Sequence, residues 1–201
     1  ENNWAIINVN GILIYRPSFL EELFGAIDTA NLIELFSAAV NSNDNKGIIL
    51  KINSPGSEVT GIEEFANLIF ESAQKSQKPI VSYVDGMAAS AAFWIATQAD
   101  SVYALASSIV GSVGVITVLT DTTRAEKNAG LDSYYLKTGE NKAVGVGQIS
   151  DNQLEVYKEI QNNIYQKFVN AVQRGRGLTM SDTEKDGRIF TAEQVVNRFV
   201  D

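Results

Sequence analysis

The sequence predicts an α/β fold with a mainly parallel sheet, and three observations support this class. Short apolar runs typical of buried strands alternate with segments of helical periodicity along the 201 residues. The hydrophobic content of 45% is ordinary for a globular core. No internal repeat, low-complexity segment or linker interrupts the alternation, so residues 1–201 are expected to form a single domain.

The first half of the chain supplies four strands and two helices in this interpretation. Strands are expected at residues 4–9, 12–15, 47–52 and 79–84, and helices at 28–40 and 62–73. Asn10-Gly11 lies between the first two strands and is typical of a hairpin turn. Asp28 is a suitable cap for the first helix. Glu63 and Glu64 fall in the first turn of the second helix, where the helix dipole favours acidic side chains.

The second half begins with a run of small residues, Ala88–Ala92, that leads into the apolar residues 93–96. Further strands are expected at 101–105, 113–118 and 133–136, and helices at 122–129, 151–172 and 191–199. Thr191 is the expected cap of the last helix. Residues 139–147 have no periodicity and are expected to form a loop.

Two residue types are absent, because the chain contains no histidine and no cysteine. A Ser-His-Asp triad, a Cys-His pair, a thiolate nucleophile, a disulfide and a Cys/His zinc site are therefore excluded within the chain. An enzyme built on it must use a carboxylate, a lysine, a tyrosine or a borrowed group as its general base. No cofactor is implied.

The charge balance argues against nucleic acid as a partner. The net charge is −8, and the only dense basic spot is Arg174-Gly175-Arg176. No stretch approaches the roughly 18 to 20 apolar residues of a membrane span. The first apolar run, residues 4–9, is too short for a signal peptide and has no basic residues before it. The chain starts at Glu1 rather than Met, which leaves a preceding anchor open.

Two loops that follow predicted strands are candidates for chemistry, because ligands of open α/β sheets bind at the carboxyl ends of strands. In Asn53–Ser57, proline fixes one dihedral and glycine frees the next, so amides can point outward and cradle an oxyanion. A plain strand-to-helix turn has the same composition. In the second loop, Ser90 begins a helix between alanines. It is either an accessible nucleophile or the N-cap of a closely packed helix. The Gly-x-Ser-x-Gly motif is absent.

A serine nucleophile without histidine can use a neutral lysine. The lysine pKa must then fall from ~10.4 to about 7 or 8, which requires burial away from carboxylates. Lys142 lies in the loop after a predicted strand, and Lys137 ends that strand. Glu140 would oppose the shift if it pointed at the Lys142 amine. Most loop lysines are solvated surface charges, and this alternative applies to both Lys137 and Lys142.

The order and spacing of these motifs resemble the signal peptide peptidase A family, which includes the head-maturation proteases of tailed phages. The resemblance extends from about Ile12 to the end of the chain, and residues 83–99 are most similar to the phage members. The motifs that carry it are Ile52-Asn53-Ser54-Pro55-Gly56, Asp85–Ala92, Val110–Val115, Lys142 and Asp186–Thr191.

This resemblance implies a role for each matching residue. Ser90 would be the nucleophile and Lys142 its general base, while Ser112 would hydrogen-bond the lysine. The amides of Ser57 and Ala91 would form the oxyanion hole, and Gly56 would belong to the same substrate-binding loop. The family usually has a second glycine where this chain has Ser57, and a serine would be strained there if the position needs a positive φ.

The resemblance also implies a Clp protease/crotonase-like fold of repeated ββα units that assembles into a homo-oligomeric ring or dome. The implied activity is an ATP-independent endopeptidase acting on signal-peptide-like or phage scaffold and capsid peptides. A cytoplasmic, phage-encoded protein is expected, or a membrane-anchored one if a segment precedes Glu1.

Two alternatives remain open. A crotonase-like acyl-CoA hydratase or thioesterase would rely on carboxylates, of which Glu58, Glu63 and Glu64 follow the first loop. A non-catalytic head-assembly scaffold would carry a vestigial Ser/Lys pair, and the serine at position 57 is its only support.

Overall fold

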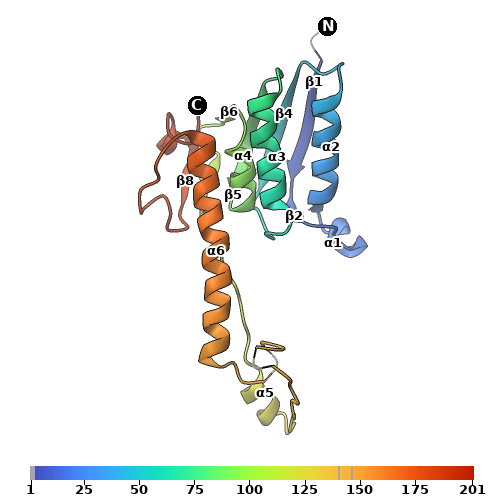
Figure 1. The fold of residues 1–201 in the computed structure, drawn as a ribbon, viewed down its shortest axis with the longest axis vertical. Helices are drawn as coiled ribbons and strands as arrows, with labels where there is room; N and C mark the ends of the chain where they lie inside the picture. The colour runs from blue at the N-terminus through green and yellow to red at the C-terminus, as the bar shows by residue number, and fades with distance from the viewer. Residues whose placement is uncertain (1–2, 140, 146) are drawn as a thin grey trace. The chain divides into compact units, whose positions relative to one another are not determined.

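The structure is a computed structural model that describes residues 3–139, 141–145 and 147–201. The chain divides into two compact units, and Figure 1 labels the helices and strands of both. The larger unit comprises Glu1–Gly114 and Gln166–Asp201, and the smaller unit comprises Val115–Tyr165.

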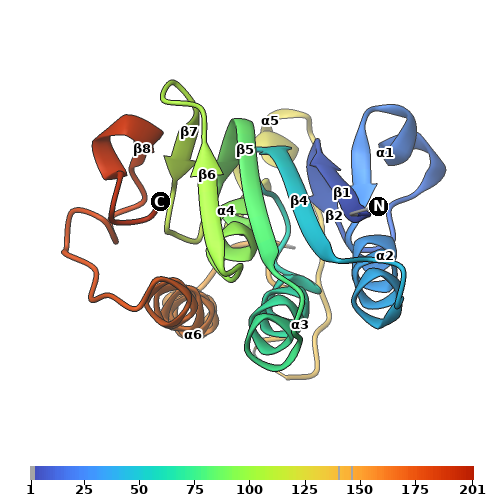
Figure 2. The same ribbon diagram turned by 90° about the horizontal axis from the view of Figure 1, so that it is seen from above.

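A six-stranded sheet forms the centre of the larger unit (Figures 1 and 2). Its strands are β1 (Trp4–Asn10), β4 (Gly47–Ser54), β5 (Ile80–Ala89), β6 (Ser101–Ala104), β7 (Ile109–Gly111) and β8 (Ile189–Thr191). The order is β1-β4-β5-β7-β8, and β6 also pairs with β5. The ladders are parallel apart from that between β7 and β8, which confirms the predicted fold class.

Helices line up along one face of this sheet (Figure 2). They are α2 (Thr29–Asn41), α3 (Ile62–Lys75), α4 (Ala91–Ala96) and the C-terminal part of α6 (Asp151–Arg176). Asp28 caps α2 as predicted, because its Oδ1 accepts the N–H of Ala30 at 2.8 Å. Glu63 and Glu64 lie in the first turn of α3, also as predicted.

The core of the larger unit lies between the sheet and these helices. Three aromatic pairs anchor it, Phe36–Phe65, Phe93–Phe199 and Trp94–Phe168, with ring centroids 5.7, 5.3 and 4.8 Å apart. Every residue of α4 is buried. The turn that joins β5 to α4 is therefore fixed on both sides by packed elements, and Ser90 occupies that turn.

The N-terminal hairpin predicted from Asn10-Gly11 is wrong. β1 pairs in parallel with β4, and β2 (Ile12–Ile14) pairs in parallel with β3 (Ala26–Asp28) in a separate two-stranded sheet. Gly11 has a φ of +132° and donates its N–H to Asn53 O at 3.1 Å. The glycine therefore bends the chain from one sheet into another instead of reversing it. A short helix missed by the sequence, α1 (Phe19–Leu23), lies between β2 and β3 and is capped by Ser18.

The predictions for the second half were partly correct. The helix at 122–129 is α5 (Thr123–Asn128), and the long helix is α6, which extends to Arg176. The strands expected at 113–118 and 133–136 are wrong, because these residues form no strand; β7 ends at Gly111. The last helix is a single turn, η1 (Ala192–Val195), although Thr191 does cap it.

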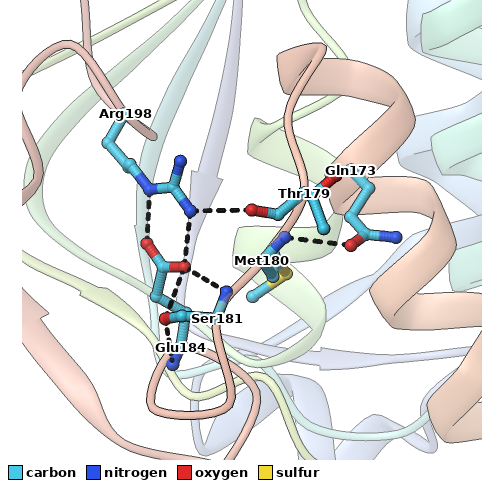
Figure 3. A network of polar contacts seen from close by, with 6 residues as sticks. All are labelled: Gln173, Thr179, Met180, Ser181, Glu184 and Arg198. Carbon is cyan, nitrogen blue, oxygen red and sulfur yellow. Dashed lines mark hydrogen bonds and ion pairs between the residues drawn. The ribbon is translucent and has the colours of Figure 1, made fainter.

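A network of hydrogen bonds and ion pairs holds the segment between α6 and β8 in place (Figure 3). The Glu184 carboxylate accepts hydrogen bonds from Arg198 at 2.6 and 2.7 Å, and from the Ser181 amide at 2.7 Å. Arg198 also donates to Thr179 O, and the N–H of Met180 donates to Gln173 on α6. The segment that precedes β8 is thus held by buried and half-buried charges rather than by regular structure.

No helix within the described ranges is both long enough and apolar enough for a membrane crossing.

Candidate active site

Ser90 occupies a sharp turn between β5 and α4. Its backbone angles, φ 52° and ψ −125°, lie in a region that residues with a side chain rarely adopt. Its amide donates to Gly111 O at 2.9 Å, and its carbonyl accepts from Trp94 at 3.0 Å. Although Ser90 precedes the helix, its side chain makes no capping hydrogen bond. The strained backbone is thus held by its neighbours while the hydroxyl is left out of the helix cap, as a nucleophile requires.

The loop Ser54–Ser57 lies directly against this turn. Gly56 has a φ of +88°, and a Cβ on it would come within 2.7 Å of both Ala89 O and Ala91 N and 2.9 Å of Ser90 Cβ. Only glycine permits this approach. The buried Ser54 fixes the loop from inside, because its Oγ accepts the Gly56 N–H at 3.1 Å. Sequence reasoning missed this role of Ser54, although its position two residues before a glycine is typical of such a turn.

Two backbone amides at this contact are suited to an oxyanion. Ser57 forms a parallel bridge with Leu13, but the two hydrogen bonds of the bridge use Gly56 O and Glu58 N, which leaves the Ser57 N–H outside it. Ala91 is the first residue of α4, where helical amides have no partner within the helix. The φ of Ser57 is +157°, so this position does have a positive φ, but it lies next to the extended region and far from the +60° to +90° of a left-handed turn.

Ser112 follows β7 on the same edge of the sheet. Its N–H donates to Arg188 O at 2.7 Å, and the residue before it, Gly111, accepts the Ser90 amide at 2.9 Å. Because β4, β5 and β7 run parallel, their carboxyl ends meet at one edge. The larger unit therefore brings together five of the predicted site residues: Gly56, Ser57, Ser90, Ala91 and Ser112.

The two candidate lysines lie in the smaller unit. Lys142 is exposed in a turn over residues 141–145, and its amide donates to Gly139 O at 3.1 Å. Lys137 is exposed as well, and the strand expected to precede it is absent from residues 133–136. Glu140 lies outside the described residues. No geometry therefore links either lysine to Ser90, and their roles stay predictions.

The carboxylates of the acyl-CoA alternative have ordinary structural surroundings. Glu63 forms an ion pair with Lys167 on α6 at 2.7 Å, and it shares the first turn of α3 with Glu64. Neither needs a ligand to explain its position. Across the described ranges, no group of three or more Asp, Glu, His or Cys side chains is placed to hold a metal ion.

Comparison with known proteins gives two family matches. Residues 72–201, more than half of the chain, match Peptidase family S49, and residues 16–110 match Clp protease. A putative protease of Methanocaldococcus jannaschii is 34% identical over 170 residues, which are 83% of this chain and 54% of that protein.

More distant relatives come from bacteria and a phage. Protease 4 of Haemophilus influenzae is 28% identical over 185 residues, 92% of this chain and 29% of that protein. The head-tail preconnector protein GP5 of Enterobacteria phage P21 is 26% identical over 163 residues, 81% of this chain and 32% of that protein. The chain thus spans about half or less of the length of these relatives.

Proposed function

The chain belongs to peptidase family S49, a family of serine proteases, and we propose that it is itself an ATP-independent serine endopeptidase with Ser90 as nucleophile. The observation that carries the proposal is the contact between Gly56 and the Ser90 turn, with a Cβ on Gly56 falling 2.7 Å from Ala91 N. This contact sets the amides of two separate loops beside one strained, uncapped serine, which is the arrangement that acyl transfer needs.

In the proposed reaction, Ser90 Oγ attacks the carbonyl carbon of the scissile peptide bond and its proton passes to the Lys142 amine. The amides of Ser57 and Ala91 donate to the oxyanion of the tetrahedral intermediate. When the C–N bond breaks, the Lys142 ammonium returns the proton to the leaving amine, and an acyl-enzyme remains. Water then attacks the ester with Lys142 as base, and Ser90 is regenerated.

The assignment of Lys142 rests on residue chemistry and family resemblance. Histidine is absent from the chain, and among the bases that remain the family resemblance points to a lysine. The hydroxyl of Ser112 can orient a neutral amine without adding charge. Lys137 is the competing candidate. The pH profile of activity is expected to have no limb near ~6.5 from an imidazole, because the chain has no histidine.

We also propose that the two units act as one peptidase domain within a homo-oligomer. Support comes from the smaller unit, where Ile116, Val118, Tyr134 and Leu136 are each more than three-quarters exposed. Exposed apolar side chains of this size mark an interaction surface where they form a contiguous patch. A second copy of the chain could cover them and could supply the burial that a neutral lysine needs.

The substrate is proposed to be a peptide or unfolded protein. The family resemblance implies phage scaffold or capsid peptides, cleaved in the cytoplasm, and the similarity to a head-tail preconnector protein of a phage supports a phage source. Similarity to a putative signal peptide peptidase of Enterococcus faecium favours signal peptides instead. Mapping the cuts made in purified scaffold and signal peptides separates these two substrate classes.

A fluorophosphonate probe tests the mechanism directly. The wild-type protein is expected to be labelled at Ser90, and Ser90→Ala is expected to abolish both labelling and peptide cleavage. Lys142→Ala should lower the labelling rate by about 100-fold or more, as expected for loss of a general base, whereas Lys137→Ala should leave it unchanged. Cleavage that persists in pure Ser90→Ala protein would disprove the mechanism. Loss with Lys137→Ala but not with Lys142→Ala would move the base to Lys137.

A further inference from the structure

The strand that leads to Ser90 changes its partners just before the candidate nucleophile. Residues Val81–Val84 of β5 pair with β6, and residues Met87–Ala89 pair with β7. On its other side β5 pairs with β4, where Ile52 matches Val84 but Ser54 matches Ala88. One residue of β4, Asn53, thus lies opposite three residues of β5, Asp85, Gly86 and Met87. This is a β-bulge at the approach to the active site.

The Asn53 side chain bridges this bulge. Its Oδ1 accepts the N–H of Met87 at 3.2 Å, in place of the backbone partner that the register shift removes. Its Nδ2 donates to Oδ1 of Asn10 on β1 at 3.1 Å. A Cβ at position 86 would fall 2.4 Å from Asn53 Oδ1, so a glycine is needed there for the amide to fit. Gly86 therefore leaves the space that the side-chain amide of Asn53 occupies.

The other side of β5 is fixed by a buried hydroxyl at the start of the same bulge. Val84 O accepts a hydrogen bond from Ser108 Oγ at 3.0 Å and another from Leu105 N at 3.1 Å. Ser108 is buried and lies immediately before β7. With Val84 held from this side and Met87–Ala89 paired with β7, the amide of Asn53 is the side-chain contact from β4 that fixes Met87 where the segment leaves the bulge.

We propose that Asn53 is a positioning residue for Ser90, an inference that rests on the proposed serine peptidase function. Ser90 follows Met87 by three residues, and Gly56 leaves no free space against Ala89 O, Ala91 N and Ser90 Cβ. A small displacement of Met87–Ala89 is therefore transmitted to the distance between the nucleophile and the oxyanion amides. Errors of about 1 Å in such distances can cost roughly 100-fold in rate.

A positioning role differs in its effects from a merely stabilising one. Asn53 is exposed and lines a polar cleft of about 150 Å³ with Asn8, Asn10, Lys51 and Asp85, so water can replace its bond to Met87 when the side chain is removed. Little stability is then lost, because no donor is left buried without a partner. The loss is expected in the acylation step, while substrate binding is unchanged.

The test compares Asn53→Ala, Asn53→Asp and Asn10→Ala in the full chain. With a peptide that the wild type cleaves, Asn53→Ala should lower kcat by about 10- to 100-fold with KM within about twofold of wild type. Asn53→Asp keeps an oxygen for the Met87 N–H and should recover most of kcat, since the Asn10 amide can turn to donate to it. Asn10→Ala removes only the outer bond and should stay within about threefold.

Gly86→Ala supplies an independent variant that acts on the same contact. Its Cβ should displace the Asn53 amide and lower kcat as Asn53→Ala does, and the double variant should be no worse than Asn53→Ala alone. Additive losses would show that the glycine acts elsewhere. An Asn53→Ala enzyme with unchanged kcat, or one whose loss appears only in KM, would overturn the proposal.

Amide exchange of Met87 by NMR keeps this inference separate from the proposed function. Exchange of the Met87 N–H should accelerate by about fivefold or more in Asn53→Ala and should be unchanged in Asn10→Ala. If the wild type proves inactive but exchange responds in this way, the peptidase proposal fails while the bulge contact stands. Unchanged exchange in Asn53→Ala overturns the positioning role whatever the activity.

Discussion

The two units of the chain differ in what holds their side chains in place. In the larger unit, a parallel sheet and buried aromatic pairs surround the Ser90 turn, and backbone contacts fix Gly56, Ser57 and Ala91 around it. In the smaller unit, the large apolar side chains such as Leu136 are exposed. The nucleophile and the oxyanion amides depend on backbone geometry, which a packed sheet supplies. The proposed base, Lys142, is an exposed side chain on a surface turn, so the groups that would bury it must lie outside that turn.

The largest contrast is expected from truncation of an apolar side chain in each unit. Phe65 is fully buried against Phe36, and Phe65→Ala should lower the free energy of unfolding by about 3–5 kcal/mol because it leaves a cavity. Leu136 is fully exposed, and Leu136→Ala should change it by less than about 0.5 kcal/mol. Urea unfolding at low protein concentration measures both. Similar losses in the two variants would mean that the smaller unit has a core of its own.

Alanine substitution of one positive-φ glycine in each unit extends the comparison of the two units to the reactivity of Ser90. Gly56→Ala places a Cβ 2.7 Å from backbone atoms of the nucleophile turn, and the labelling rate of Ser90 should fall by about 100-fold or more. Gly130 in the smaller unit has a φ of +73° with nothing within 4 Å of its added Cβ. Gly130→Ala carries the same kind of backbone strain without the clash.

The matched glycine therefore separates strain from contact. Labelling of Gly130→Ala should stay within about threefold of wild type, whereas a comparable loss in both variants would show that backbone strain alone explains the effect of Gly56→Ala. Retention of full labelling in Gly56→Ala would contradict the close contact on which the proposed oxyanion site rests.

The sequence predicts local structure well and the pairing of distant segments poorly. Buried strands and amphipathic helices follow from local periodicity, so β4, α2, α3 and the fold class were predicted correctly. Partner choice is not local: Asn10-Gly11 has hairpin chemistry, but β1 pairs in parallel with β4, which is distant in sequence, from Trp4–Gly47 to Asn10–Asn53. The segments 113–118 and 133–136 have the composition of strands, yet they form none because no sheet edge takes them up.

The candidate site shows the same limit. Ser90 and the Ser54–Ser57 loop could be found because strand-to-helix turns with small residues have recognisable sequences. Asn53 as a bridge across a bulge could not, since its role depends on a register shift between β4 and β5. Ser108 gave no sequence signal either, because its partner, Val84 O, is a backbone atom that any residue at 84 would present.

The smallest expected effect concerns one carboxylate in each unit. Arg198 donates to Glu184 and, together with the Ser181 bonds, lowers the pKa of Glu184 to about 2 despite partial burial (Figure 3). A pKa that is lower in the folded state stabilises the fold above the unfolded value of 4.5, and this contribution is lost as the pH falls from 4.5 toward 2. Because Arg198 is partly exposed, the contribution is about 1–2 kcal/mol after screening.

The matched residue is Glu126 of the smaller unit, whose pKa is also lowered, chiefly by a hydrogen bond from Thr122, but whose partners are neutral hydroxyl groups and not a guanidinium. Glu184→Gln should lower the free energy of unfolding at pH 7, and its difference from wild type should shrink as the pH falls below 4.5, because the carboxylate of the unfolded wild-type chain is then protonated while the folded one is still ionised. Glu126→Gln should stay closer to the wild-type curve, because the hydroxyl partners of Glu126 can also donate to a neutral amide oxygen. Urea unfolding between pH 7 and pH 3 measures both curves. If Glu126→Gln differed from wild type as strongly with pH as Glu184→Gln does, the charge of the Arg198 guanidinium would not explain the strength of the Glu184 contacts, and the two units would not differ in how they hold these carboxylates.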